Sequence, residues 1–291
     1  MSTYAARRYG PSALGGDLRR FVELTVTLAR TEFKLRYFGS VLGYLWSLMR
    51  PLLFFGVIYV VFARVFSFGD GIPHYPVYLL TGIVLWTYFG EATSGCVQCL
   101  VQREALLRKI RFPRLVIPLA VSLTALFNLA VNFIAVLVFA LADGVYPRIS
   151  WLWMLAIVLG FMLLATGLGM LLSALYVRFR DIQPIWEVVV QALFYASPIM
   201  YVASRFKGAE HVALQSPPAM LLTQMGHSFV HPHKVWVLSQ GRRSLQDPMR
   251  SAAAAAGGPI HLIIPLALIP AIFALGFWVF AREAPRVAEN L

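Results

Sequence analysis

The stretch from Asp17 to Ala63, DLRRFVELTVTLARTEFKLRYFGSVLGYLWSLMRPLLFFGVIYVVFA, decides the fold of this chain. Up to Arg36, apolar residues recur at the spacing that places them on one side of an α-helix, and basic residues gather on the other side. Such a helix lies along a membrane surface, with its apolar side toward lipid. The chain then turns at Gly39-Ser40 and enters the membrane. The basic residues of this interface helix are Arg19, Arg20, Arg30, Lys34 and Arg36.

The composition is that of a membrane protein. Of all residues, 59% are apolar and 13% are charged, whereas soluble proteins carry roughly 25% charged residues. Uncharged runs cover 115–142, 149–177 and 251–281, and each exceeds the ~20 residues that a helix needs to cross a bilayer. The net charge of +12 comes from arginines at the ends of these runs, so we expect no nucleic-acid partner. The sequence predicts an all-α polytopic membrane protein.

We predict six transmembrane helices, at roughly 41–63, 75–100, 115–142, 151–176, 184–203 and 260–281. With the amino terminus inside, the cytoplasmic segments hold sixteen Lys and Arg residues and the external segments eight, six of them in one long loop that counts little for topology. Both termini are therefore expected in the cytoplasm. This divides the chain into a cytoplasmic region 1–37, a membrane domain 38–281 and a tail 282–291.

Two charged residues fall inside the predicted spans. Arg50 precedes Pro51 in the first span and Glu91 lies in the second, each about 13–15 Å from the cytoplasmic end at ~1.5 Å per residue. An ionisable residue inside a membrane is a functional candidate, and a partner of opposite charge reduces the cost of burying it. We expect either an Arg50–Glu91 ion pair, within one protomer or across a dimer, or two charges that face a water-filled cavity independently.

Two segments outside the spans are also expected to be helical. Arg103–Arg114, with its apolar side and terminal Pro113, predicts a short cytoplasmic helix that docks a partner or only positions the next span. Pro217–Met225, within the outer loop 204–259, is apolar but too short to span a membrane. It predicts a re-entrant or interfacial helix.

Motifs for chemistry are missing from the sequence. No Gly-x4-Gly-Lys-Ser/Thr phosphate loop occurs, so ATP hydrolysis is expected in another chain. Cys96 and Cys99 lack the second ligand pair of a zinc site, and we expect them to pack in the interior. The histidines lie near the outer side without further ligands at metal-binding spacing. We therefore predict no catalytic residue, metal or cofactor in this chain.

Aromatic residues are frequent in the first, second and fifth predicted spans. Sugar rings stack on aromatic faces while their hydroxyls bond to Tyr and Trp edges, although a single aromatic residue in a membrane more often faces lipid. As a set, these residues predict a path for a glycan. They are Tyr44, Trp46, Tyr59, Trp86, Tyr88, Phe89, Tyr195 and Tyr201.

Four segments recur in a familiar order: RYFGSVLGYLW at 36–46, LRKIRFPR at 107–114, FRDI at 179–182 and SPIMY at 197–201. Together they resemble the permease subunits of type-2 ABC exporters that move polysaccharide or lipid-linked polysaccharide, such as O-antigen, capsule or teichoic acid. The resemblance extends over about residues 20–285. Arg50 departs from it, because similar sequences usually carry a small amide there.

The resemblance implies an assembly of two permeases with two ABC ATPase subunits, which bind ATP and magnesium, in the cytoplasmic membrane. It places the interface helix 17–36 beside the cytoplasmic gate, makes the helices before the last span an outer gate, and puts the path between the two permeases. It also implies a coupling helix that docks on the ATPase. The coupling residues are Arg103, Leu106, Leu107, Arg108, Lys109, Ile110, Arg111, Phe112, Pro113 and Arg114.

The predicted function is therefore the membrane subunit of an ATP-driven exporter of polysaccharide, which performs no chemistry itself. Two alternatives stay open. The first is a type-2 ABC exporter of a drug or a small lipid. The second is an ATP-independent carrier or channel, whose mark would be internal repeats with interrupted spans; the sequence shows no such repeats.

Overall fold

The computed structural model describes residues 18–37, 43–67, 69, 72–104, 113–203, 214–230, 235–239, 242–246 and 249–290. Its longer helices are α1 (Leu18–Tyr37), α2 (Gly43–Tyr59), α3 (Tyr75–Val97), α6 (Val116–Ala142), α7 (Trp153–Arg178), α8 (Ile182–Ala196) and α12 (Ile263–Asn290). Its shorter elements are η1 (Val60–Val65), α4 (Cys99–Gln102), η2 (Ile149–Leu152), α10 (Pro217–Met225), η4 (Gly226–Val230), β1 (Val235–Ser239), β2 (Arg242–Gln246), α11 (Ala252–Ala255) and η5 (Pro259–Leu262).

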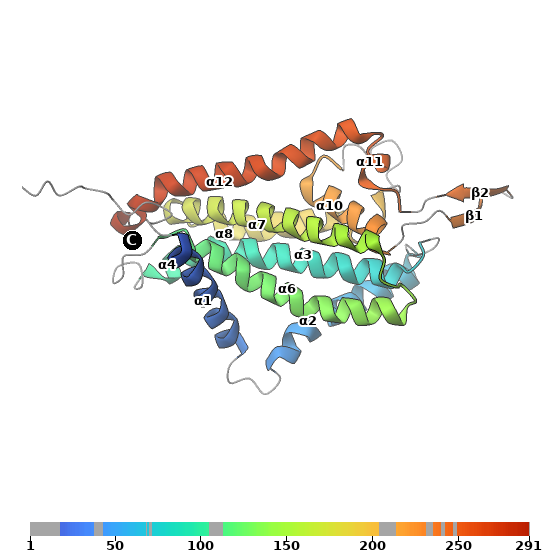
Figure 1. Ribbon diagram of the computed structural model, residues 1–291, viewed down its shortest axis with the longest axis horizontal. Helices are drawn as coiled ribbons and strands as arrows, with labels where there is room; N and C mark the ends of the chain where they lie inside the picture. Colours follow the sequence, from blue (N-terminus) through green and yellow to red (C-terminus); the bar gives the residue numbers. More distant parts are fainter. Residues whose placement is uncertain are drawn as a thin grey trace, which may run out of the picture.

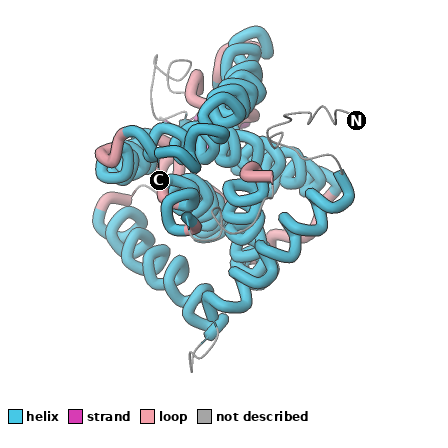
Figure 2. Tube along the Cα trace, turned by 90° about the vertical axis from the view of Figure 1, so that its left-hand side faces the viewer, coloured by secondary structure: helices cyan, strands magenta, loops and turns pink. Residues whose placement is uncertain are grey.

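The long helices form one bundle. Helices α3, α6, α7, α8 and α12 run roughly along its long axis, while α1 and α2 approach it obliquely (Figure 1). Figure 2 views the same bundle nearly along the helices. Apart from the hairpin β1–β2, the part of the chain that the structure describes is built of helices and their connections, as the all-α prediction required.

Four helical stretches in the described residues are long and apolar enough to cross a membrane: Leu45–Val65, Val116–Ala142, Ile149–Arg178 and Pro259–Glu283. The chain is thus a multi-pass membrane protein. Helices α3 and α8, which correspond to the second and fifth predicted spans, are not among the four. With 15 residues, α8 is about 22 Å long, shorter than the ~30 Å hydrocarbon core. The count of six spans stays a prediction.

Helix α3 lies at the centre of the bundle, where it contacts α2, α6, α7 and α8. Most of its side chains are buried, so its surface meets protein and can carry polar groups that lipid would not accept. The hydroxyls of Thr81 and Thr93 donate to carbonyls one turn back, those of Val77 and Phe89, at 2.7 and 2.8 Å. This central position accounts for the mixed composition of α3.

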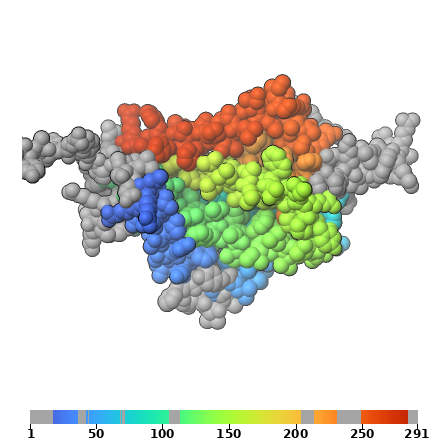
Figure 3. Space-filling view, in the orientation of Figure 1, coloured from blue at the N-terminus to red at the C-terminus, as the bar shows by residue number. Residues whose placement is uncertain are grey.

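Helices α7 and α12 cross at two glycines. A Cβ atom on Gly167 would lie 2.6 Å from the Cα of Phe273, and one on Gly276 would overlap the carbonyl group of Gly167. Small residues allow such close backbone contact between membrane helices, where van der Waals packing drives association. Figure 3 shows α12 covering the upper side of the bundle along most of its length.

The predicted interface helix is present as α1, but its apolar side is divided. Phe21, Thr25 and Ala29 are buried, and α1 packs against α6. Phe33 meets Phe127 of α6 edge-to-face at 5.8 Å between ring centroids. Other apolar residues remain exposed, namely Leu18, Val22, Leu24 and Leu35. The expectation that the whole apolar side faces lipid was therefore wrong, because α6 supplies a protein surface to part of it.

The end of the bundle that the predicted topology places outside contains one predicted helix and several unpredicted elements. Helix α10 spans Pro217–Met225, as predicted, and the Ser216 side chain caps it by accepting from the Ala219 N–H at 3.3 Å. The antiparallel hairpin β1–β2 projects beyond the bundle (Figure 1). Its strands are separated in the sequence by Gln240-Gly241, a spacing typical of tight hairpins. The part of the outer loop at 204–213 lies outside the described residues.

Candidate functional site: a polar cavity at the α1–α2 corner

A cavity of about 540 Å³ lies where the end of α1 and the first turns of α2 meet α3 and α6. Its volume falls within the ~300–1,000 Å³ typical of ligand sites. Both charges that the sequence placed inside the membrane face it. The lining residues are Arg36, Gly43, Trp46, Ser47, Arg50, Pro51, Thr87, Gly90, Glu91, Asn128 and Asn132.

Glu91 is the centre of a polar network that joins three helices. Its carboxylate forms an ion pair with Arg36 in the last turn of α1 and accepts a hydrogen bond from the Asn128 amide of α6 at 2.7 Å. Asn132, one turn further along α6, donates to the Asn128 carbonyl at 2.9 Å. The carboxylate is thus neutralised and hydrogen-bonded, which is how a charge is retained in a poorly solvated site.

The predicted Arg50–Glu91 pair is not formed within the protomer. Arg36 takes the place of Arg50 because the packing of α1 on α6 brings the end of α1 beside Glu91. Arg50 lines the same cavity and is exposed, and within the described part of the chain it has neither a hydrogen bond nor an ion pair. Arg50 and Glu91 thus line one cavity without pairing to each other in this protomer, and the alternative of two charges facing a water-filled cavity stays a prediction.

A second ion pair connects α1 to the far end of the α3–α4 segment, which the sequence-based topology places in the cytoplasm. Arg103, directly after α4, pairs with Glu32 of α1, and both side chains are mostly buried. Burial raises the pKa of the Glu32 carboxyl above its usual value, and the positive charges of Arg103 and Arg36 offset part of that increase.

The predicted coupling helix is only partly visible. Arg103, Pro113 and Arg114 are described, whereas residues 105–112 lie outside the described residues. That range contains Leu106, Leu107, Arg108, Lys109, Ile110, Arg111 and Phe112. The docking role of the whole segment stays a prediction.

The aromatic residues of the predicted path do not share one surface. Trp86, Tyr88 and Phe89 are buried inside the bundle, where Phe89 packs against Trp86 at 5.2 Å between ring centroids. Trp46 and Tyr195 are half-exposed. Tyr59 and Tyr201 are intermediate, and the side chain of Tyr44 lies outside the described residues. In this conformation the exposed members are available to a substrate; the path itself stays a prediction.

A polar row on α8 escaped the sequence analysis. Gln183, Glu187, Gln191 and Tyr195 follow one another at intervals of four residues, which places them on one helical side. Gln183 donates to the Glu187 carboxylate at 3.1 Å, and Glu187, Gln191 and Tyr195 are exposed. In a membrane bundle, such a row faces water or protein. The four-residue spacing of polar side chains was the signal that could have revealed it.

The buried side of α8 fixes the orientation of this row. Trp186 donates from its indole nitrogen to the Thr93 hydroxyl of α3 at 3.1 Å. Phe194 contacts Phe54 of α2, with 5.6 Å between ring centroids. Helices α2 and α8 are therefore neighbours over α3. Glu187, Gln191 and Tyr195 of the polar row are exposed, whereas Gln183 accepts a hydrogen bond from the Gln98 amide at the end of α3.

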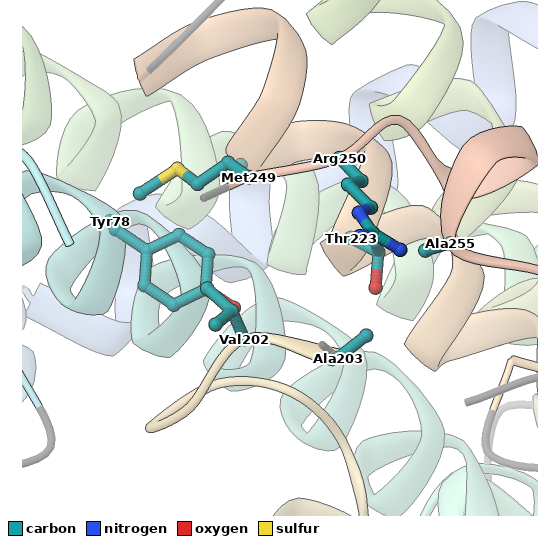
Figure 4. Close-up of a pocket in the computed structure, with 8 residues that line it drawn as sticks. Tyr78, Val202, Ala203, Thr223, Met249, Arg250 and Ala255 are labelled. Atoms are coloured by element: carbon teal, nitrogen blue, oxygen red, sulfur yellow. The ribbon is translucent and has the colours of Figure 1, made fainter. Parts of the chain in front are cut away.

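A small pocket beside α10 is a packing feature. Its volume of about 10 Å³ is small, at the lower limit for one water molecule. Tyr78 and Arg250 border it from opposite sides (Figure 4). The Tyr78 hydroxyl donates to the Tyr201 carbonyl at 3.0 Å, and a Cβ on Gly226 would lie 2.8 Å from the Tyr78 ring. The hydrogen bond ties α3 to the segment after α8, and a pocket of this volume leaves no room for a substrate.

The described residues contain no group of three or more His, Cys, Asp or Glu side chains that could hold a metal ion. Cys96 and Cys99 are buried free thiols. His74 and Asp143 form an isolated pair, 2.8 Å apart, which links the start of α3 to the end of α6.

Comparison with known proteins identifies the family. Residues 23–223, more than half of the chain, match the ABC-2 type transporter family. An O-antigen export system permease protein RfbA from Klebsiella pneumoniae is 30% identical over 188 residues, which cover 64% of this chain and 72% of that protein. The protein of the same name from Myxococcus xanthus is 29% identical over 221 residues, or 75% and 84% of the two chains. The resemblance to type-2 ABC permeases is thus confirmed, and the chain belongs to the ABC-2 type transporter family.

Proposed function

We propose that this chain is the membrane-spanning subunit of an ATP-driven exporter that moves polysaccharide, in lipid-linked form, across the cytoplasmic membrane. The observation that carries the proposal is its similarity to two proteins named as O-antigen export permeases, over 72% and 84% of their lengths. The sequence has no phosphate loop, so two copies of a partner ABC ATPase bind ATP and magnesium. The chain contributes no catalytic residue.

The path for the glycan lies between two copies of the chain. The polar row of α8 supports this arrangement, because Glu187 and Gln191 are exposed on the protomer and would be poorly placed against lipid. Carboxylate and amide groups accept hydrogen bonds from sugar hydroxyls. The half-exposed rings of Trp46 and Tyr195 offer stacking surfaces beside them.

Movement in the ATPase reaches this path through the two ion pairs of α1. The coupling segment Arg103–Arg114 docks on the ATPase from the cytoplasm, where both termini also lie. Arg103 is tied to Glu32, and Arg36 at the end of the same helix is tied to Glu91 of α3. A shift of the coupling segment therefore displaces α1, and α1 transmits the displacement to the centre of the bundle.

The test is co-expression with the neighbouring ABC ATPase in a bacterium that lacks its own O-antigen exporter. We expect glycan at the cell surface, and none when the ATPase carries a substitution in its phosphate-loop lysine. Surface glycan that does not depend on the ATPase would favour a carrier. ATP-driven transport of a drug or small lipid by the purified complex, without glycan transport, would favour the other alternative.

A matched pair of substitutions tests the coupling segment. Arg108→Ala with Phe112→Ala is expected to abolish co-purification of the ATPase while membrane insertion stays normal. Arg148→Ala, at the opposite end of the bundle in the sequence-based topology, serves as the control. ATPase binding that survives the first change would contradict the docking assignment.

A further inference from the structure

We propose that the cavity at the α1–α2 corner binds the phosphate group of a membrane-anchored anionic lipid, with Arg50 as its main ligand. Arg50 faces the cavity without a hydrogen bond or ion pair in the described part of the chain. Arg50 is exposed on the protomer, at a position that the sequence places within a membrane span, where a charge is stabilised by a partner of opposite sign. Its guanidinium can therefore bind a negative group from outside the chain.

The charges in the cavity indicate how much negative charge it accepts. Among the residues that the structure describes, the lining contains two guanidinium groups, those of Arg36 and Arg50, and one carboxylate, that of Glu91. Arg36 is already paired with Glu91, so one positive charge is left for a ligand. A neutral sugar would not satisfy it, and a cation would be repelled.

Hydrogen-bonding groups beside Arg50 favour an oxyanion with several oxygens. The planar guanidinium binds phosphate through two parallel hydrogen bonds. Thr87, Asn128 and Asn132 also line the cavity, so polar side chains surround the position of the guanidinium.

The position of the cavity favours a lipid over a soluble anion. It is bounded by the end of α1 and the first turns of α2, where the sequence passes from a basic surface helix to an apolar span. The half-exposed Trp46 lines it, and Trp is favoured where lipid headgroups meet hydrocarbon. A headgroup can enter here while its chains stay in the bilayer.

Two lipids carry suitable phosphate: the diphosphate that links a glycan to its polyprenyl carrier, and the headgroup of an ordinary anionic phospholipid. The choice of the glycan carrier as the physiological source rests on the proposed function. The phosphate site itself does not depend on it.

The experiment uses the full-length chain with its ABC ATPase in dodecyl maltoside, a detergent without phosphate. Farnesyl diphosphate, phosphatidylglycerol and farnesol are titrated, and bound lipid is counted by native mass spectrometry. We expect saturable binding of farnesyl diphosphate and none of farnesol.

Arg50→Gln should weaken the binding of farnesyl diphosphate about tenfold or more, the effect of losing one charge-assisted hydrogen bond. Arg50→Lys should retain part of the affinity, and Arg64→Gln, an exposed arginine outside the cavity, should change nothing.

Glu91→Gln provides a test of opposite sign. It removes the negative charge from the lining and releases Arg36, so we expect farnesyl diphosphate to bind several-fold more tightly. A purely structural role of the cavity would predict weaker binding instead. Equal affinities of Arg50→Gln and Arg64→Gln, or weaker binding by Glu91→Gln, would overturn the proposal.

The lipid comparison separates the two sources. A preference of about tenfold or more for farnesyl diphosphate over phosphatidylglycerol supports the glycan carrier, whereas equal Arg50-dependent binding of both supports a phospholipid headgroup. A wild-type complex that binds farnesyl diphosphate through Arg50 but exports no glycan would overturn the proposed function alone. A complex that exports glycan while Arg50→Gln alters neither binding nor export would overturn the phosphate site alone.

Discussion

The α7–α12 crossing and the α1–α2 corner attach helices to the same bundle by different means. At the crossing, Gly167 and Gly276 bring two backbones into direct contact. At the corner, α1 packs against α6 along its buried side, and its ion pairs to Glu91 and Arg103 lie beside a cavity of about 540 Å³. Backbone packing tolerates little displacement, whereas ion pairs beside a cavity can reform in a new position. The comparison indicates a rigid side and a movable side.

The largest effect is expected at the glycine crossing. Gly276→Ala places a methyl group against the Gly167 carbonyl, so α12 must move away from α7 at a cost of about 1–3 kcal/mol in the free energy of unfolding. Gly56→Ala in α2 is the control, because a Cβ there has no atom within 4 Å. Thermal unfolding in detergent measures both. A control variant as unstable as Gly276→Ala would show that the crossing is not specially tight.

The Arg36–Glu91 pair is expected to contribute less. Arg36→Ala leaves Glu91 with its Asn128 hydrogen bond but without a counter-charge. Because the Arg36 side chain is 43% exposed, solvent screening reduces the cost to about 1 kcal/mol. Arg19→Ala, which breaks the exposed Arg19–Glu23 pair, should change stability by less than about 0.5 kcal/mol. Equal effects of the two changes would remove the distinction between corner and surface.

Glycan export should be more sensitive to Arg36→Ala than to Gly276→Ala, which is the reverse of the order expected for stability. Arg36→Ala uncouples α1 from α3 and is expected to reduce export by at least about tenfold at equal protein level, while a mild change at the crossing lowers export only through protein amount. Surface glycan normalised to permease in the membrane measures both. Normal export by Arg36→Ala would contradict the movable role of the corner.

Weakening the attachment of α8 to α3 should lower stability by an amount between those expected for Gly276→Ala and Arg19→Ala. Trp186→Phe removes the hydrogen bond to Thr93 but keeps most of the packing, so we expect a loss of about 0.5–1.5 kcal/mol. Trp153→Phe, on an exposed position of α7, is the matched control. If the two variants unfold at the same temperature, the indole hydrogen bond does not hold α8 against α3.

The sequence predicted best what depends on local pattern. The surface helix, the long apolar helices and the short helix Pro217–Met225 all follow from periodicity, charge and length. It also identified Arg50 and Glu91 as neighbours of one site, since helix rise fixes their depth. It could not tell that Arg36 would reach Glu91, because that contact depends on how α1 packs against α6.

Packing also decides which aromatic residues are exposed. Phe89 and Tyr195 look alike as members of an aromatic set, yet the first is buried between helices and the second is half-exposed. Periodicity within one helix does not show which side its neighbours cover. The polar row of α8 was detectable in principle, because its four-residue spacing is a property of one helix alone.

The smallest effect concerns Glu32, whose pKa is raised above the usual value chiefly by burial. A carboxyl with a raised pKa in the folded state holds its proton more tightly there than in the unfolded chain. Its contribution to stability is therefore fully present below the unfolded pKa of about 4.5 and is lost as pH rises through the folded pKa. Glu32→Gln should flatten this part of the stability profile between about pH 4.5 and neutrality.

Glu23→Gln, on the exposed side of α1, is the control and should leave the profile unchanged. Melting temperatures measured across this pH range for the three proteins decide the matter: parallel profiles would mean that folding does not raise the pKa of the Glu32 carboxyl, and that the pair with Arg103 fully offsets the cost of its burial.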